Sequence, residues 1–279
     1  MGIVQTKKGN GGGYVQSFNF TPDSACTAGN FMRLVIANGI SDVTGVSDNQ
    51  SNTWIKAIEH NGSGRQILIY YAYNNNGGSP QVTITTSNFA DTAYIFTEQD
   101  ELDTTTDPLD KTVGATTSGT THASGNTATT SQAREYLVGA AAFETSAPGV
   151  SGDASWSNLN SQAGFDSFTS VAVQDRFVTS TGAYGITFTT TATPAGAVAV
   201  ATFKEASTLQ QEGYRFRADD GSESGATWLA NQDTNISRGK NTNTRLRVIL
   251  NATGDPASQQ YQLEGRVKGG GGSWVPIHL

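Results

Sequence analysis

The sequence predicts an all-β protein in which an antiparallel, jelly-roll-like β-sandwich is followed by a small, β-sandwich-like C-terminal domain. Val, Ile, Phe and Tyr recur at alternate positions in short runs, which is the period of a half-buried β-strand. Gly, Thr, Ser and Asn fill the segments between these runs, as is typical of polar turns. Charged residues make up only 15% of the chain, which suits short strands better than surface helices.

The strand pattern is clearest in residues 53–73, which read as two strands joined by a turn at 61–64. In the second strand the apolar side chains point to both faces, as in the run Ile67, Leu68, Ile69 and Tyr70. A strand that is apolar on both faces needs cover on both faces. We therefore expect this strand in the middle of a sheet, with other elements packed over each side.

Further short runs predict the strands that complete the sandwich. They lie at residues 3–6, 14–20, 31–37, 82–86, 93–96, 135–143, 168–173, 184–188 and 198–203. The Thr-rich segment 112–130 is either a pair of edge strands or a flexible arm, and its alternating threonines favour edge strands. Residues 144–164 are expected to form a long loop anchored by Trp156, and such loops often carry function.

The domain boundary is predicted at residues 205–212, a polar linker without strand alternation. The β-sandwich domain covers residues 1–204, and the small C-terminal β domain covers residues 213–279. Strands are expected in the latter at 214–217, 245–250, 261–267 and 274–277. Arginine is frequent only in this domain, at Arg215, Arg217, Arg238, Arg245, Arg247 and Arg266.

Charge and composition exclude several classes of partner and cofactor. With a net charge of −7 and no basic run beyond Lys7-Lys8, we predict that the chain binds no nucleic acid. No apolar run is long enough to cross a membrane, and residues 1–13 lack the apolar core of a signal peptide. The lone Cys26 excludes an internal disulfide. The three histidines, His60, His122 and His278, are scattered along the chain, which disfavours a zinc site. We therefore predict that the protein binds no metal ion and no cofactor.

No catalytic motif is present in the sequence. It contains no Gly-x-Ser-x-Gly elbow, no phosphate-binding P-loop and no His-Glu-x-x-His metal motif. We therefore predict that the protein is not an enzyme and has no catalytic residues. One alternative stays open, because a pair of glycosidase carboxylates can meet only in the fold, and the candidates are Asp100, Glu101, Asp153 and Asp166.

The acidic segment 98–110 offers a second alternative, a calcium site. Calcium binds clustered carboxylate oxygens, and five carboxylates fall within eleven positions: Asp100, Glu101, Asp103, Asp107 and Asp110. The spacing does not match an EF-hand loop, and no glycine occupies a central position. Asp107-Pro108 is typical of a turn, so we predict a solvated loop without a metal ion.

Two groups of segments resemble known proteins. Residues 27–31 (TAGNF), 46–54 (VSDNQSNTW) and 107–111 (DPLDK) resemble β-sandwich domains of tailed-phage virion proteins and bacterial surface proteins. Residues 214–223 (YRFRADDGSE), 226–228 (ATW) and 251–256 (NATGDP) resemble a small β module of similar proteins. The resemblance implies a setting in the virion and assigns no catalytic role to these motifs.

We therefore expect a structural protein of the virion of a tailed bacteriophage, most specifically a capsid decoration or cement protein. Its expected partners are the major capsid protein or other virion proteins, and two further copies of itself in a homotrimer. Residues 1–13 and 112–130 are the segments expected to add a strand to a neighbouring subunit. The alternatives are a tail or fibre component, or an adhesion module that binds host-surface glycans through Trp156 or Tyr184, although lone aromatics in sandwiches usually belong to the core.

Overall fold

The computed structural model is all-β. It describes residues 2–39, 41–100, 102–145, 148–166, 168–206, 208–221, 225, 227–253, 264–265, 273 and 275–276, and these residues contain no helix. Contacts along the chain divide it into an N-terminal unit, 1–206, and a C-terminal unit, 207–279. All strand pairs within the sheets are antiparallel.

The described residues of the first half of the N-terminal unit form eight strands. They are β1 (Ile3–Asn10), β2 (Val15–Phe20), β3 (Phe31–Asn38), β4 (Val43–Asp48), β5 (Ile55–Asn61), β6 (Gln66–Ala72), β7 (Val82–Ala90) and β8 (Thr92–Gln99). Five of them form a sheet with the order β1-β8-β3-β6-β5, and the other three form a sheet with the order β2-β7-β4.

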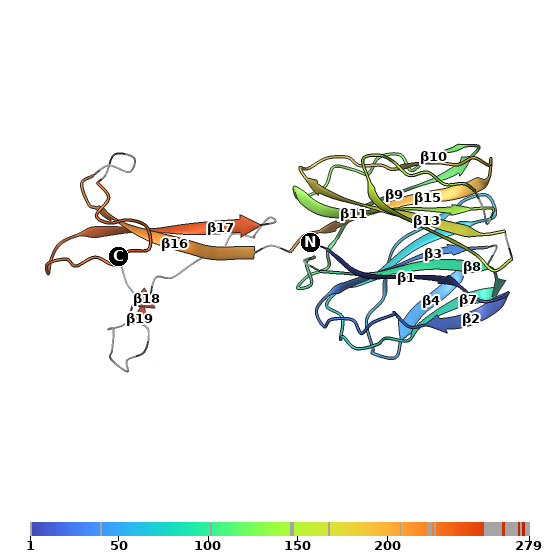
Figure 1. Cartoon of the computed structure of the whole chain (residues 1–279), viewed down its shortest axis with the longest axis horizontal. Helices are drawn as coiled ribbons and strands as arrows, with labels where there is room; N and C mark the ends of the chain where they lie inside the picture. The colour runs from blue at the N-terminus through green and yellow to red at the C-terminus, as the bar shows by residue number, and fades with distance from the viewer. Residues whose placement is uncertain are drawn as a thin grey trace. The chain divides into compact units, whose positions relative to one another are not determined.

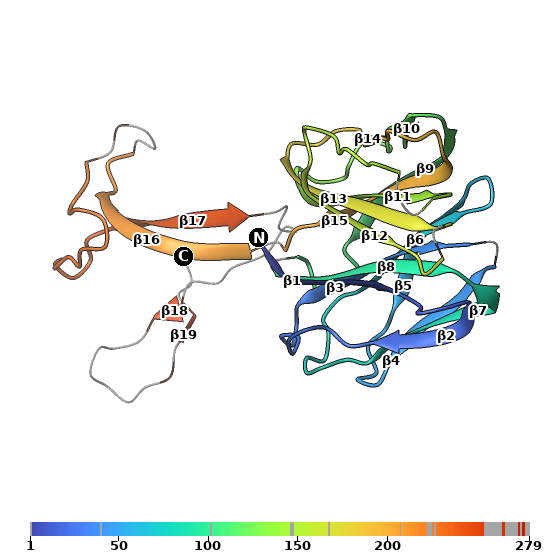
Figure 2. The ribbon, with the colours of Figure 1, turned by 45° about the vertical axis from the view of Figure 1, so that its right-hand side comes forward.

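The second half contains seven strands. They are β9 (Leu109–Ser118), β10 (Thr121–Ala123), β11 (Arg134–Phe143), β12 (Ser157–Ala163), β13 (Ser170–Thr179), β14 (Thr187–Thr189) and β15 (Ala195–Lys204). Their sheets have the orders β12-β13-β11-β15-β9 and β10-β14. The four sheets are stacked, with the two five-stranded sheets in the middle and the smaller sheets outside (Figures 1 and 2).

The two halves repeat one strand pattern. The run β1-β8-β3-β6 in the first half corresponds to the run β9-β15-β11-β13 in the second. In both runs the first strand of the half pairs with its last strand, and the last strand also pairs with the third. Thr86 and Thr190 occupy matching places, since each hydroxyl donates to the carbonyl two residues on, at 2.7 and 2.8 Å. The counterpart of β4 is reduced to a single bridge between Ser151 and Thr189. Residues 1–204, for which the sequence predicts a single sandwich, therefore consist of two similar halves, each with a five-stranded sheet and a smaller sheet.

Hydrophobic clusters fill each space between neighbouring sheets. The central cluster joins the two five-stranded sheets and includes Val35, Ile69, Val138 and Val173. Two further clusters lie between each five-stranded sheet and its smaller neighbour. Every residue of β6 is buried, which confirms that this strand has cover on both faces.

The edges of the two five-stranded sheets lie against each other. Beside β12, Lys8 of β1 donates to the Ser161 carbonyl at 3.2 Å. Beside β5, Thr116 of β9 donates to the Asn61 carbonyl at 3.1 Å. Gly114 allows this approach, because a Cβ there would lie 2.8 Å from the His60 ring. Strand β1 within the segment 1–13 is thus an edge strand of its sheet. Within 112–130 the residues of β9 form the edge of the second five-stranded sheet, as the alternating threonines predict, and those of β10 pair with β14.

A buried ion pair joins the two halves at the central cluster. The Arg33 guanidinium of β3 lies 2.7 Å from the Asp175 carboxylate of β13, and both side chains are 1% exposed. Tyr136 donates its hydroxyl proton to the same carboxylate oxygen at 2.7 Å. Burial raises the pKa of Asp175, and the charge of Arg33 opposes that rise. Either charge therefore depends on the other to remain in the core.

Removing one partner of this pair should destabilise the N-terminal unit strongly. We expect Arg33→Met to lower the free energy of unfolding by about 3–5 kcal/mol, because Asp175 would remain buried without its counter-charge. Urea denaturation followed by tryptophan fluorescence measures this change. The double variant Arg33→Met with Asp175→Leu should regain most of the loss, and a loss below about 1 kcal/mol for Arg33→Met alone would contradict the prediction.

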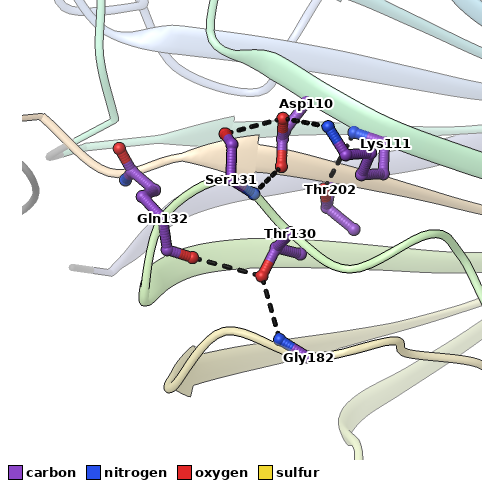
Figure 3. A network of polar contacts seen from close by, with 7 residues as sticks. All are labelled: Asp110, Lys111, Thr130, Ser131, Gln132, Gly182 and Thr202. Carbon is purple, nitrogen blue, oxygen red and sulfur yellow. Dashed lines mark hydrogen bonds and ion pairs between the residues drawn. The ribbon is translucent and has the colours of Figure 1, made fainter.

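A second polar network holds the start of β9, at Asp110 (Figure 3). Asp110 accepts hydrogen bonds from the Ser131 backbone at 2.6 Å and from the Lys111 ammonium at 2.8 Å. Burial alone would raise the pKa of Asp110, but these hydrogen bonds lower it to about 2. The buried Glu135 lies beside this carboxylate, and burial together with the Asp110 charge raises the pKa of Glu135 to about 7.

Glu135 should make stability depend on pH. Between pH 4.5 and about 7 the folded chain holds a proton that the unfolded chain has lost, so the free energy of unfolding falls as pH rises through this window. We expect the free energy of unfolding of Glu135→Gln to exceed that of the wild type by up to about 3 kcal/mol at pH 8 and to equal it near pH 4.5. Thermal melts at both pH values test this, and an equal difference at both would count against it.

The C-terminal unit is built on an antiparallel ribbon of β16 (Thr208–Ala218) and β17 (Thr244–Thr253). A short pair, β18 (Glu264–Gly265) and β19 (Val275–Pro276), lies further along the chain. Strand β16 begins inside the segment 205–212 to which the sequence assigns a linker. Most of the strands expected at 261–267 and 274–277 lies outside the described residues.

Candidate functional site

The acidic segment uses its carboxylates in local turns. Asp103 accepts hydrogen bonds from the backbone and hydroxyl of Thr105, at 2.9 and 2.8 Å, and from Thr106. Asp107 accepts the Tyr71 hydroxyl at 2.6 Å. Glu101 lies outside the described residues, and among those described no three Asp, Glu, His or Cys side chains gather in a metal-binding group. Asp103 thus belongs to a local turn, whereas Asp100 and Asp110 accept hydrogen bonds from the backbones of Gly2 and Ser131, which lie far away in the chain.

We expect calcium to leave the stability of this protein unchanged. Since the oxygens of Asp103 and Asp107 already accept hydrogen bonds within the loop, calcium would have to displace these contacts. Melting temperatures with excess calcium and with a chelator should agree within about 1 °C. A calcium-dependent rise that disappears in the Asp103→Ala/Asp107→Ala variant would show a metal site instead.

Other residues singled out by sequence reasoning serve the fold. Trp156 is 5% exposed and donates its indole N–H to the Gly185 carbonyl at 3.2 Å, and the partly buried Tyr184 packs against the same cluster. His122 is buried between hydroxyls of Thr117 and Thr190. Burial raises the pKa of Cys26 to about 12, so its thiol stays protonated. The Trp156 ring belongs to the core and leaves little surface for the sugar stacking that the sequence offers as an alternative.

The ribbon of the C-terminal unit has two different faces. Residues that pair across β16 and β17 share a face, so Tyr214 lies opposite Val248 and Phe216 opposite Leu246. We call this the apolar face; it comprises Tyr214, Phe216, Leu246, Val248 and Leu250. Its β17 side chains are 36–50% exposed. Among the described residues, no strand pairs with the outer edge of β17.

The opposite face of the ribbon carries arginines around Trp228. The Arg215 guanidinium lies 4.2 Å from the centre of the Trp228 ring, and those of Arg217 and Arg247 lie at 5.4 and 5.9 Å. Arg215 also donates to the Ala230 carbonyl at 2.8 Å. The tryptophan thus holds a cluster of positive charge on a unit whose sequence has a net charge of +1, whereas residues 1–206 have a net charge of −8.

An aromatic pocket opens at one end of the N-terminal unit. It has a volume of about 230 Å³ and is lined by Tyr14, Gly39, Arg65, Phe89, Ala90, Asp91, Phe168 and Thr169. In the first half the lining residues come from the connections β1–β2, β3–β4, β5–β6 and β7–β8 and from the end of β7, and in the second half they come from the connection between β12 and β13. Tyr14, Phe89 and Phe168 are 53–60% exposed, as is the neighbouring Phe165.

Two charged side chains lie at the wall of the aromatic pocket. Asp91 is 3% exposed, and its Oδ1 accepts a hydrogen bond from the Phe165 backbone at 2.6 Å. Its Oδ2 accepts no hydrogen bond from any described residue. The Arg65 guanidinium donates instead to the carbonyl oxygens of Phe168, at 2.9 and 3.1 Å, and of Gly64. Burial lowers the pKa of Arg65, and the charges of Glu144 and then Asp91 oppose this shift.

The pocket residues carry no motif that a sequence search recognises. Phe168 and Tyr14 were assigned to strands, yet both lie in turns just before β13 and β2. The available signal was a large aromatic next to a turn residue, as in Phe89-Ala90-Asp91 and Gly164-Phe165-Asp166. Such a pair becomes informative only when the fold brings the turns together.

No family model, curated protein or solved structure matches the chain. In the part of the chain that the structure describes, no helix is long and apolar enough to cross a membrane.

Proposed function

We propose that this chain is a structural protein of a tailed-phage particle, a decoration or cement protein of the capsid exterior that acts as a homotrimer. The observation that carries the proposal is the apolar face of the β16–β17 ribbon. A two-stranded ribbon is marginally stable alone, and exposed Leu246, Val248 and Leu250 gain stability when another surface covers them. Three ribbons of a trimer supply that cover to one another.

The N-terminal unit supports the same role as a rigid body. Its edge strands β1 and β9 face β12 and β5 of the other half, which leaves less edge free for unwanted pairing. Its net charge of −8 keeps assembled particles apart in solution. Arg215 and Arg247, which unlike the buried Arg217 have exposed surface beside Trp228, suit an acidic surface of the major capsid protein or another virion partner.

We also propose that each half is a modified jelly roll. Folding a long hairpin over itself pairs strand one with eight, two with seven, three with six and four with five. The pairs β1-β8, β2-β7 and β3-β6 follow this rule. The fourth pair is missing, because β5 pairs with β6 and β4 pairs with β7. In the second half β9-β15, β10-β14 and β11-β13 follow it as well.

The proposal predicts that the ribbon is needed for assembly. We expect the triple variant Leu246→Ser/Val248→Ser/Leu250→Ser to be monomeric in light scattering, whereas the wild type is trimeric. Ile249→Ser is the matched control, since Ile249 is 39% exposed on the opposite face of the same strand. Unchanged trimers in the triple variant would contradict the role of the apolar face.

Location in the particle tests the function itself. Quantitative mass spectrometry of purified particles of the encoding phage should find on the order of hundreds of copies per particle for a capsid decoration protein. A few copies, together with labelling at the tail, would assign the chain to the tail or a fibre. Absence from the particles would overturn the proposal.

A further inference from the structure

We propose that the aromatic pocket is a binding site for a neutral sugar ring, the end residue of a surface glycan. The site lies wholly within the N-terminal unit, and the inference stands whether or not the chain belongs to a virion. It is separate from Trp156, which is a core residue, and from the partly buried Tyr184, which packs against the same cluster.

Exposed aromatic rings provide the first argument. Phe89 and Phe168 line the pocket with 60% and 59% of their surface exposed, and Tyr14 completes the rim. Soluble proteins rarely gather such side chains at one exposed place without a function. The C–H groups on one face of a sugar ring are slightly positive, and they pack well on the negative face of an aromatic ring.

The carboxylate of Asp91 provides the second argument. It is held in place through Oδ1, while the buried Oδ2 lacks a protein donor among the described residues. Gly164 makes room for it, because a Cβ there would lie 2.4 Å from Oδ2. A buried oxygen without a donor costs free energy, and a ligand hydroxyl would remove that cost once the Asp91 side chain shifts far enough to present Oδ2 to the pocket. Sugars present several hydroxyl donors around one apolar ring face.

Charge favours a neutral ligand over an ion. The carboxylates of Glu144 and Asp91 both lie close enough to influence Arg65 electrostatically, so positive and negative charges oppose each other at the pocket wall. The Nε and both terminal nitrogens of Arg65 already donate to carbonyl oxygens, which leaves it poorly placed to bind an anion. A cationic ligand would gain from Asp91 but would be repelled by Arg65.

The size of the pocket fits one ring, with room for a second beside it. Its volume of about 230 Å³ is below that of typical sites for larger organic ligands. A further hollow of about 200 Å³ shares Gly39 and Arg65 with it and extends along Asn61, Gly62 and Gly64. A terminal sugar in the aromatic pocket can therefore continue into a second residue of the same glycan.

Saturation-transfer NMR with glucose, galactose, mannose, rhamnose and N-acetylglucosamine tests the proposal. We expect at least one of them to bind with a millimolar Kd, and Phe168→Ala to weaken that binding about tenfold. Asp91→Asn should weaken it similarly, because it replaces an acceptor with a donor while keeping the shape. A disaccharide that ends in the same sugar should bind more tightly if a glycan chain is the ligand, and equally if a free sugar is.

Leu159→Ala is the matched control, since Leu159 is a comparably exposed apolar residue on β12 outside the pocket lining. It should bind the sugar as the wild type does, and circular dichroism should show all three variants folded. Binding that survives both Phe168→Ala and Asp91→Asn would overturn the inference. So would the absence of binding by every sugar of the panel, particularly if Phe168→Ala instead abolished self-association.

Discussion

The central strands of the two five-stranded sheets are buried on both faces, and this constraint determines the arrangement of the N-terminal unit. In β3, β6 and β8 every residue is buried, and β11 and β15 are nearly so. Sheets of this kind must be covered twice. The chain meets the requirement by packing its two halves face to face and by placing a smaller sheet outside each. The Arg33–Asp175 pair lies within the shared layer, where each half supplies one charge.

The sequence predicts the buried strands well and the polar edge strands poorly. Alternation and β-branching identify most of β3, β6, β11 and β15, because their burial imposes an apolar residue at nearly every position. Strand β12 lies in the segment expected to be a loop. Its sequence SNLNSQA has no apolar period, because it packs on β13 at an edge and faces solvent along much of its length. Tertiary pairing, rather than local propensity, creates such a strand.

The candidate sites follow a similar division. The high arginine content of the last part of the chain was visible in the sequence. The ribbon explains it, because alternate positions of β16 and β17 place arginines on one face and apolar residues on the other. The aromatic pocket was not visible, because Tyr14, Arg65 and Phe168 come from three separate connections and Phe89 from the end of β7, in two different halves. Only the stacking of the halves brings these turns to one end of the unit.

The repeated strand pattern has a consequence for synthesis on the ribosome. All eight strands of the first half have emerged once its last strand, β8, has left the exit tunnel, so its two sheets can form early. The inner face of its large sheet, with Val35 and Ile69, then stays uncovered until β15 has been made. Arg33 also waits for Asp175 during this interval. The growing chain thus exposes an apolar sheet face for about a hundred residues of elongation. The yield of folded protein should therefore depend on how quickly these residues are translated.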